Sequence, residues 1–296
     1  MDAEKKFKDT MLSFLSLVCK RMPDDVIARL SEMREREDTP LQQAIYDTMF
    51  ENFHLAVDTS RPCCQDTGLL HFYIKAGAKF PYLGELQGWL TDCVRTATKE
   101  IPLRPNTVNF FEEKISEDGT GERIPWVHWD IVPNWDGAEI TAYFGGGGCC
   151  YPAQAKVFTP AKGYSVIPEF LFEVVTNLGL NACPPVIIGV GLGENIENAA
   201  VLSKVACLRD LGTRHPHPLG AELEDMLLEK VNSLGIGAQG MRGNQYALAV
   251  HVESSARHTA TFAVAISLAC YVHRRGAIKF DRDFNYELKH YKGVKL

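Results

Sequence analysis

The chain has 296 residues, 46% of them hydrophobic, and a formal net charge of −6 at pH 7. This length and apolar content are sufficient for one large core or two medium ones. The negative net charge and the lack of a concentrated lysine and arginine run exclude general attraction to nucleic acid. No uninterrupted apolar stretch approaches the roughly 18 residues that a membrane-spanning helix needs, so we expect no membrane association.

The first half of the chain carries the patterns of several helices and strands. Apolar residues at helical spacing predict four helices, over residues 4–21, 24–36, 40–57 and 83–98. Thr39-Pro40 has the form of an N-cap followed by a proline at the first helical position. Alternating patterns predict three strands, over residues 69–76, 125–133 and 138–144. We expect the last two strands to pair antiparallel and the polar residues 113–123 to form a hairpin tip.

The second half begins with four consecutive glycines, Gly145 to Gly148, which mark a flexible tip or a place where the backbone lies against a ligand. Helices are predicted over residues 166–179, 196–208 and 219–234, and strands over residues 186–190 and 245–253. Residues 261–271 are apolar and fit either a helix or a buried strand. No repeat or clear linker occurs. We therefore expect a single mixed α/β domain over residues 1–296, in which N-terminal helices precede a mixed sheet flanked by helices.

A glycine-rich stretch, Gly189-Val190-Gly191-Leu192-Gly193, follows an apolar strand and precedes a helix. This context is typical of a dinucleotide-binding fingerprint, but the spacing fails because Glu194 stands where the third glycine of that fingerprint is required. An acidic residue also has the wrong charge for a phosphate site. The stretch therefore predicts a tight strand-to-helix turn.

Nine cysteines are spread irregularly along the chain: Cys19, Cys63, Cys64, Cys93, Cys149, Cys150, Cys183, Cys207 and Cys270. Their odd number and the size of the chain indicate reduced thiols rather than a disulfide framework. The apolar residues 11–19 are followed by Lys20 and Arg21 without a small-residue cleavage site, which predicts a core helix rather than a signal peptide. We therefore expect a cytoplasmic protein. Because no Cys-x-x-Cys pair occurs, cysteines that bind a metal must converge from distant parts of the chain.

Three of the cysteines lie beside turn-forming or charged residues. Cys64 opens the turn-forming stretch Cys64-Gln65-Asp66-Thr67-Gly68. Cys183 precedes Pro184-Pro185, which fix an extended backbone, and Cys270 is followed by His273-Arg274-Arg275. A nearby positive charge favours the thiolate, which is the form of cysteine that binds metals.

Other residues with useful chemistry accompany these thiols. Arg104, Arg257 and the pair Arg274-Arg275 are candidate carboxylate clamps. Asp66 and His258 are candidate acid–base groups. Three cysteines with a vacant fourth position would suit a [4Fe–4S] cluster with one open iron. Such an iron acts as a Lewis acid and orients a bound hydroxy acid. Spacing alone leaves open the alternative that the thiols only pack in the core.

Several motifs occur together in a fixed order: Cys64 to Gly68, Leu103-Arg104-Pro105-Asn106, Gly145 to Gly148, Asn181 to Pro185, Leu234 to Gly240, Val250 to Glu253 and Cys270 to Gly276. In this combination the chain resembles the α-subunit part of the class I fumarase and L(+)-tartrate dehydratase family of iron–sulfur hydro-lyases. Three motifs resemble tartrate dehydratases more than fumarases: Gly84 to Gln87, Pro125 to Asp130 and His273 to Gly276.

The resemblance implies a fold like the N-terminal domain of class I fumarases and a set of site residues. Cys64, Cys183 and Cys270 would bind the [4Fe–4S] cluster, and Gln65, Asp66, Arg104 and Gly147 would contact the substrate. Asp66 would also tune proton abstraction. His258 would donate a proton to the departing hydroxyl. The chain departs from the family pattern in two places: Cys149-Cys150 replaces the small or polar residue usual after the glycines, and Cys63 adjoins Cys64.

The resemblance also implies a partner and a reaction. The family's remaining substrate-binding and proton-abstracting residues belong to a second domain or to a separate β subunit. We therefore expect a β subunit and an α2β2 heterotetramer that converts L(+)-tartrate to oxaloacetate. Malate and fumarate are the alternative substrates, because malate shares the two carboxylates and a hydroxyl. A four-cysteine electron-transfer protein and a cluster-free dicarboxylate-binding protein are the rival classes.

Overall fold

The computed structural model describes residues 3–296. The chain divides into two compact units, each with its own sheet and core. Unit 1 contains the segment that ends at Asp24 together with Glu51–Gly146 and His273–Leu296, and unit 2 contains Asp25–Phe50 and Gly147–Val272. The chain thus passes between the units more than once, and the expectation of a single domain over residues 1–296 stays a prediction.

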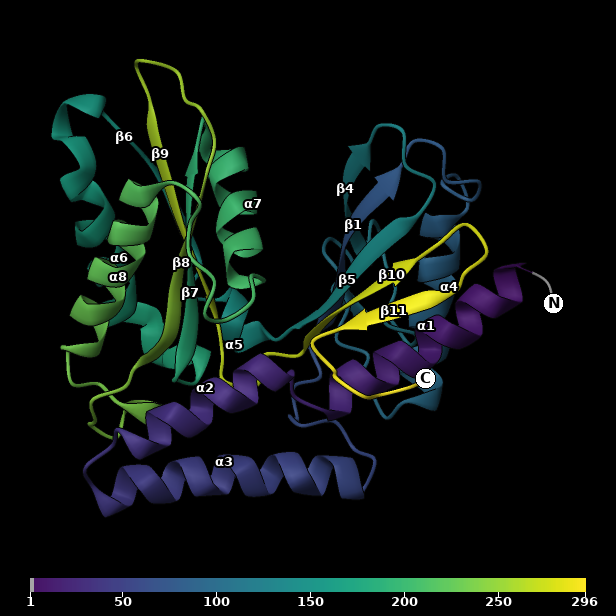
Figure 1. Cartoon of the computed structure of the whole chain (residues 1–296), viewed down its shortest axis with the longest axis horizontal. Coiled ribbons are helices and arrows are strands. Elements are labelled where there is room, and N and C mark those ends of the chain that lie inside the picture. The colour runs from purple at the N-terminus through teal and green to yellow at the C-terminus, as the bar shows by residue number, and fades with distance from the viewer. Residues whose placement is uncertain (1–2) are drawn as a thin grey trace. The chain divides into compact units, whose positions relative to one another are not determined.

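Unit 1 is built on a five-stranded mixed sheet with the strand order β11-β10-β5-β1-β4 (Figure 1). Only β1 and β4 are parallel, and the other neighbours are antiparallel. The strands are β1 (Leu69–Gly77), β4 (Trp126–Val132), β5 (Ala138–Gly145), β10 (Arg275–Phe280) and β11 (Tyr286–Lys289). Unit 1 also contains a short hairpin of β2 (Val108–Asn109) and β3 (Lys114–Ile115). The helices of the unit are α1 (Ala3–Lys20) and α4 (Leu86–Glu100).

The predicted antiparallel pair of residues 125–133 and 138–144 is wrong, although both segments are strands. Strands β4 and β5 each pair with β1, which lies between them. The connection between them crosses the end of β1, where Lys79 N–H donates to Trp135 O at 3.0 Å and Gly77 N–H donates to Gly137 O at 2.9 Å. Neighbouring strands in sequence therefore straddle a third strand, an arrangement that local patterns do not encode.

The core of unit 1 lies between the two helices and one face of its sheet. Helix α1 buries Phe7, Met11, Phe14 and Val18, which recur at helical spacing, against residues that alternate along the strands, such as Phe72, Ile140 and Ile278. The buried face of α4, Leu86, Leu90, Cys93, Val94 and Ala97, joins the same cluster. The alternation of buried and half-buried residues along β1 follows from this single covered face.

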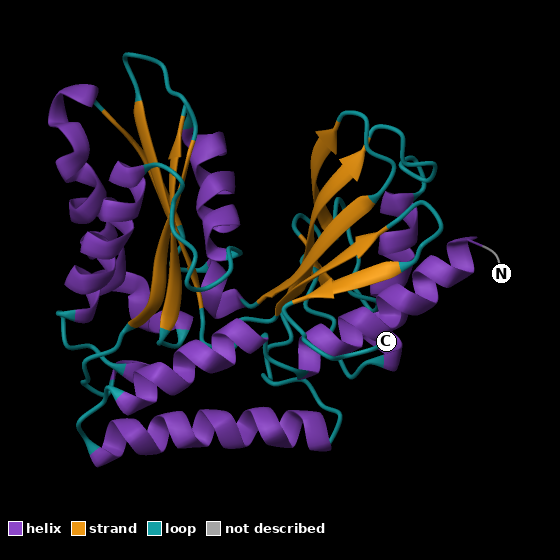
Figure 2. Ribbon diagram, viewed as in Figure 1, coloured by secondary structure: helices purple, strands orange, loops and turns teal. Residues whose placement is uncertain are grey.

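Unit 2 is built on a four-stranded sheet with the order β6-β9-β7-β8, in which only β7 and β8 are parallel (Figure 2). Its strands are β6 (Gln154–Phe158), β7 (Val186–Gly193), β8 (Ala247–Ser254) and β9 (Phe262–Ala269). Its helices are α5 (Gly147–Cys150), α6 (Val166–Leu178), α7 (Ile196–Cys207) and α8 (Pro218–Asn232), with 3-10 turns η1 (Pro160–Ser165), η2 (Gly179–Ala182) and η3 (Ala238–Gly240). Helix α2 (Asp24–Glu35) lies almost wholly in unit 2, and α3 (Pro40–Asp58) runs from unit 2 into unit 1.

The glycine-rich strand β7 shows why its residues alternate in size. Ile188 and Val190 pack in the core formed with α6 and α8, whereas the glycines face α7 on the other side of the sheet (Figure 2). A Cβ added at Gly189 would lie 1.9 Å from Ser203 O, and one at Gly191 would lie 2.0 Å from Ala199 O. The predicted tight strand-to-helix turn is confirmed, since β7 ends at Gly193 and α7 begins at Ile196. The glycines also allow α7 to pack closely on the strand.

Residues 261–271, left open between helix and strand, form strand β9, and all eight of its residues are buried. The strand lies inside the sheet with layers on both faces, so it lacks the alternation that identifies a half-exposed strand. Strands β3, β6, β10 and β11 and helix α5 were not predicted. The mixed α/β class with N-terminal helices is confirmed, with two principal sheets in place of one.

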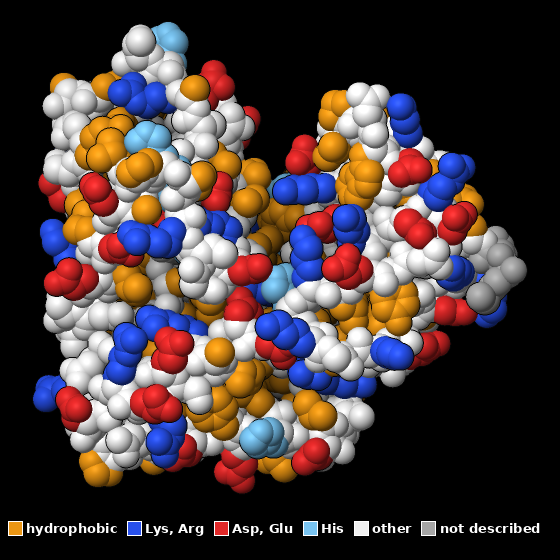
Figure 3. All heavy atoms as spheres, in the orientation of Figure 1, with side chains coloured by type: hydrophobic (Ala, Val, Ile, Leu, Met, Phe, Trp, Pro, Cys, Tyr) orange, Lys and Arg blue, Asp and Glu red, His pale blue; other side chains and the backbone are white. Residues whose placement is uncertain are grey.

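Within residues 3–296 no helix is long and apolar enough to cross a membrane. On the face drawn in Figure 3, basic and acidic side chains are interspersed. This mixture agrees with the modest net charge of −6.

Candidate functional site

The eight predicted site residues are divided between the two units. Unit 1 carries Cys64, Gln65, Asp66 and Arg104, and unit 2 carries Gly147, Cys183, His258 and Cys270. The boundary falls within the run of four glycines, between Gly146 and Gly147, and again between Val272 and His273. Each half of the candidate site is therefore described within its own unit.

In unit 1, the stretch from Cys64 to Gly68 forms a turn that leads into β1. Asp66 Oδ1 accepts hydrogen bonds from Gly68 N–H at 2.9 Å and from Asn106 Nδ2 at 3.2 Å. Thr67 Oγ1 accepts the N–H of Arg104 at 2.9 Å. These bonds join the turn to the segment around Arg104, so Asp66 and Arg104, predicted from separate motifs, belong to one structural group. The role of Asn106 was not foreseen, although it lies in the same motif as Arg104.

Glycines allow the end of β5 to approach this turn closely. Gly68 has φ of +73°, and a Cβ there would lie 2.7 Å from Gly145 C. A Cβ at Gly146 would lie 2.9 Å from Asp66 Oδ2. Gly68 therefore allows the end of β5 to approach the turn closely, and Gly146 leaves space for the carboxylate of Asp66.

The two arginines after Cys270 do not form exposed carboxylate clamps. Arg274 is 2% exposed and Arg275 is fully buried. Arg274 Nη2 donates to the main-chain oxygen of Asp66 at 2.8 Å. By contrast, Arg104 and Arg257 keep exposed side chains, so only these two of the predicted clamps reach solvent.

In unit 2, Cys183 and Cys270 lie at the same end of the sheet. Strands β7 and β9 are antiparallel, and Ile187 pairs with Ala269. Cys183 lies shortly before Ile187, at the end of η2, and Cys270 directly follows Ala269. Cys270 N–H also donates to Cys149 Sγ at 3.3 Å. Three cysteines from separate segments therefore gather at this end, and the contribution of Cys149 was not foreseen.

Burial separates the thiols into two groups. Cys64 and Cys270 are partly exposed and Cys150 and Cys183 are exposed, whereas the other five cysteines are buried. Burial raises the pKa of Cys19 and Cys207 to about 11 and the pKa of Cys63 and Cys93 to about 12. The accessible group contains every predicted ligand. These thiols fit an iron–sulfur cluster, whose iron is held by cysteine thiolates.

The buried position of Cys63 bears on the choice between it and Cys64. Cys63 Sγ donates to Lys20 O at 2.9 Å, and the side chain is 4% exposed. Its thiol therefore serves as an internal donor in unit 1. The geometry favours Cys64 as the accessible member of the pair.

His258 lies at the opposite end of β9 from Cys270. The eight residues of that strand span about 26 Å. The exposed ring accepts the N–H of Ala260 through Nδ1 at 3.1 Å, and Arg257 Nη1 donates to His258 O at 3.0 Å. Within unit 2, His258 is thus remote from the cysteine end. Next to it, Arg257 lines a cavity of about 680 Å³ together with His215, His217 and Phe262.

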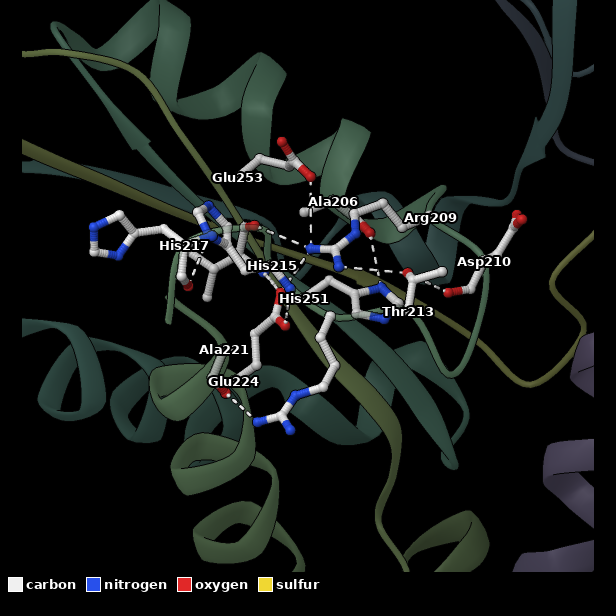
Figure 4. A network of polar contacts seen from close by, with 12 residues as sticks. Ala206, Arg209, Asp210, Thr213, His215, His217, Ala221, Glu224, His251 and Glu253 are labelled. Carbon is white, nitrogen blue, oxygen red and sulfur yellow. Dashed lines mark hydrogen bonds and ion pairs between the residues drawn. The ribbon is translucent and has the colours of Figure 1, made fainter. Parts of the chain in front are cut away.

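Other ionisable groups near β8 belong to a structural network (Figure 4). Arg209 Nη1 lies 2.6 Å from Glu224 Oε1 and 3.5 Å from Glu253 Oε1. His251 is buried, and its Nδ1 lies 3.2 Å from Ala206 O. These contacts tie α7, α8 and β8 together, so His251 and Glu253 stabilise unit 2.

Residues 3–296 contain no group of three or more His, Cys, Asp or Glu side chains spaced to hold a metal ion. No disulfide joins any of the nine cysteines, all of which lie in the described part of the chain.

Comparison with known proteins supplies the family. The model of the family described as "Fumarate hydratase (Fumerase)" matches residues 8–279, which is most of the chain. The chain belongs to the fumarate hydratase family. The resemblance derived from the motifs is therefore confirmed.

Members of this family with curated names cover nearly the whole chain. The L(+)-tartrate dehydratase subunit alpha of Escherichia coli strain K12 is 46% identical over 285 residues, which are 96% of this chain and 94% of that protein. The protein of the same name from strain UTI89 is also 46% identical. The putative L(+)-tartrate dehydratase subunit alpha of Methanocaldococcus jannaschii is 33% identical over 277 residues, which are 93% of this chain and 97% of that protein. The relatives and the family description both name hydro-lyases acting on dicarboxylic acids.

Proposed function

We propose that this chain is the α subunit of an iron–sulfur hydro-lyase that eliminates water from L(+)-tartrate and yields oxaloacetate after tautomerisation of the enol product. The observation that carries the proposal is the 46% identity to L(+)-tartrate dehydratase subunit alpha over 96% of the chain. A 2-hydroxy dicarboxylic acid offers two carboxylates and a hydroxyl, and the chemistry of the candidate residues matches these groups.

Cys64, Cys183 and Cys270 are the proposed ligands of a [4Fe–4S] cluster. Their accessibility supports the choice, because the buried cysteines are held as thiols in the core. The position of Cys183 and Cys270 at one end of the unit 2 sheet supports it further. When bound, a cluster with one open iron supplies a Lewis acid for the substrate hydroxyl.

The chain's own residues have separate tasks in the proposal. Arg104 binds a substrate carboxylate, since its guanidinium is exposed while its main-chain N–H is fixed by Thr67. Gln65 and Gly147 contact the substrate as well. Asp66 influences proton abstraction, and its orientation is fixed by Gly68 N–H and Asn106. Holding the substrate by both ends orients the C–H bond that must be broken.

His258 is the proposed proton donor to the departing hydroxyl. Its position within unit 2, at the end of β9 away from Cys270, gives this assignment no geometric support. The assignment of this role to His258 therefore depends on the family resemblance, and turnover by the His258→Asn variant tests it.

A β subunit is the proposed partner, in an α2β2 heterotetramer, and it would supply the base that abstracts the carbon-bound proton. The relatives' names, which contain "subunit alpha", support a partner. A cytoplasmic location completes the proposal, in agreement with nine cysteines that form no disulfide in the described chain.

A second candidate reaction is the interconversion of malate and fumarate, which the name of the matching family favours. Anaerobic reconstitution with ferrous iron and sulfide, followed by a substrate panel with the partner subunit present, tests both candidates. We expect a brown protein with about four irons per chain and turnover of L(+)-tartrate above that of malate. Preferred turnover of malate would select the second reaction. A colourless, air-stable protein that binds dicarboxylates would overturn both in favour of a binding protein.

A further inference from the structure

Arg274 is a buried cation with few partners. Its side chain is 2% exposed in unit 1. Nη2 donates to Asp66 O at 2.8 Å, but Nε and Nη1 have no hydrogen-bond partner among residues 3–296. The guanidinium also lies over the ring of Phe144, 5.8 Å from its centroid.

Among residues 3–296, no ion pair includes Arg274. The buried thiol of Cys19 lies near this charge, and burial raises the pKa of Cys19 to about 11, so it is protonated at neutral pH. A buried charge without an ion pair is costly to folding, and a negative group that binds beside it after folding offsets that cost.

The backbone of Arg274 is fixed while its side chain reaches the turn. Phe144 N–H donates to Arg274 O at 3.0 Å, and the next residue, Arg275, pairs with Tyr143 in the sheet. The guanidinium therefore extends from the residue that precedes β10 to the main chain of Asp66, between the proposed ligand Cys64 and Gly68.

We infer that Arg274 is a positioning residue for the turn from Cys64 to Gly68, and that its unpaired N–H groups and charge stabilise the negatively charged group that assembles there. The inference deepens the proposed function and rests on it for the identity of that group, a thiolate-ligated cluster with a dicarboxylate substrate. Arg274 itself touches neither in this role, since it acts through the main chain of Asp66 and through its charge.

The positioning role is tested first in the metal-free full chain by hydrogen–deuterium exchange. We expect Arg274→Met to speed exchange at the turn about tenfold, because a hydrogen bond from a charged donor is lost. Arg274→Lys restores a charged donor and should recover part of the protection. Arg95→Met, at an exposed arginine of α4 in the same unit, is the matched control and should change nothing at the turn. Peptides of β9 in unit 2 report global destabilisation. If these peptides also exchange faster in Arg274→Met, the positioning role is judged from Arg274→Lys, in which the turn should exchange more slowly than in Arg274→Met.

The charge role is tested by anaerobic reconstitution of the same variants with ferrous iron and sulfide. Iron content and visible absorbance should fall by at least about half in Arg274→Met and stay near wild type in Arg274→Lys, since the charge that offsets the thiolates is lost only in the first. Unchanged exchange at the turn in both variants would overturn the positioning role. Equal iron loading by Arg274→Met and wild type would overturn the charge role. If the wild-type chain itself loads no iron, the proposed cluster fails, while the exchange experiment still decides how Arg274 acts on the turn.

Discussion

At the scale of single residues, the two adjacent cysteines 63 and 64 illustrate how burial assigns chemistry. Cys63 donates to Lys20 O inside unit 1, and Cys64 is partly exposed at the start of the turn. From sequence alone, Cys63 and Cys64 are equally good candidates for a metal ligand, because adjacent residues share the same local pattern. What distinguishes them is which side chain the fold turns inward.

Replacement of each cysteine by serine tests this assignment. Cys64→Ser should lose the cluster, because a hydroxyl is a poor substitute for a thiolate on iron. Cys63→Ser should load iron normally, because serine still donates to Lys20 O. Iron content and visible absorbance after anaerobic reconstitution give the readout. A reversed result would move the ligand by one residue.

His258 offers a second residue-scale prediction. If it donates the proton, His258→Asn should leave cluster absorbance intact and lower kcat by about 100-fold or more, which is the usual contribution of a general acid. The measurement is steady-state turnover of L(+)-tartrate with the partner subunit present. An unchanged kcat would remove His258 from the mechanism, in line with its distance along β9 from Cys270.

The buried thiols predict alkaline instability. Burial raises the pKa of Cys93 to about 12, above its ordinary value of 9.0, so the folded state holds the proton more tightly than the unfolded state. The stability from this thiol is complete below about pH 9 and falls by roughly 1.4 kcal/mol per pH unit as the pH rises toward 12. Urea unfolding between pH 7 and about pH 10.5 measures it, and Cys93→Ala should show a shallower decline. Parallel pH profiles of wild type and variant would contradict this origin.

At the scale of elements, helix α8 is joined to β8 and to the segment that follows α7 by one buried carboxylate. Glu224 Oε1 accepts from Arg209 Nη1 at 2.6 Å and from Val252 N–H at 2.8 Å, and Oε2 accepts from His215 N–H at 2.8 Å. A polar residue on the inner face of a helix counts against the prediction of an amphipathic helix. Here Glu224 occupies such a position because both of its carboxylate oxygens accept hydrogen bonds, one of them in an ion pair with Arg209 (Figure 4).

Glu224→Gln should therefore destabilise unit 2 by about 3 kcal/mol, since Arg209 is left without its closest anion in a buried setting. Glu222→Gln, on the exposed face of the same helix, is the control and should stay within about 0.5 kcal/mol of wild type. Urea unfolding of both variants measures the difference. Equal stabilities would mean that the network contributes little beyond the packing of α8.

Helices of this chain could be predicted from the sequence, whereas strand pairing could not. Helical periodicity predicted α1, α4 and α6 because each has one apolar face against one core. The pairing of β4 and β5 was predicted wrongly, because strand order depends on segments far apart in sequence. At the site, Asp66 and Arg104 were predicted from separate motifs, and hydrogen bonds in the structure join their segments. The buried positions of Arg274 and Cys149 could not be predicted from local patterns.

At the scale of the whole molecule, the chain belongs to a family whose named relatives are α subunits. The full chain expressed alone should show no measurable dehydratase activity, because the proposed base lies in the partner. Addition of the partner subunit should restore turnover of L(+)-tartrate, measured as oxaloacetate formation. Full turnover by the chain alone would contradict the need for a partner.

The sheet of unit 1 has a consequence for how the protein is made. Strand β5 needs β10 as its neighbour, yet residues 147–272 of unit 2 are synthesised between them. During synthesis, the edge of β5 that pairs with β10 therefore stays without its partner strand until His273 and the following residues leave the ribosome. Open edges invite pairing with other chains, so the nascent protein is most prone to aggregation during synthesis of unit 2. Arg274 and β10 leave the ribosome together, so the hydrogen bond from Arg274 to Asp66 O forms only after residues 147–272 have been synthesised.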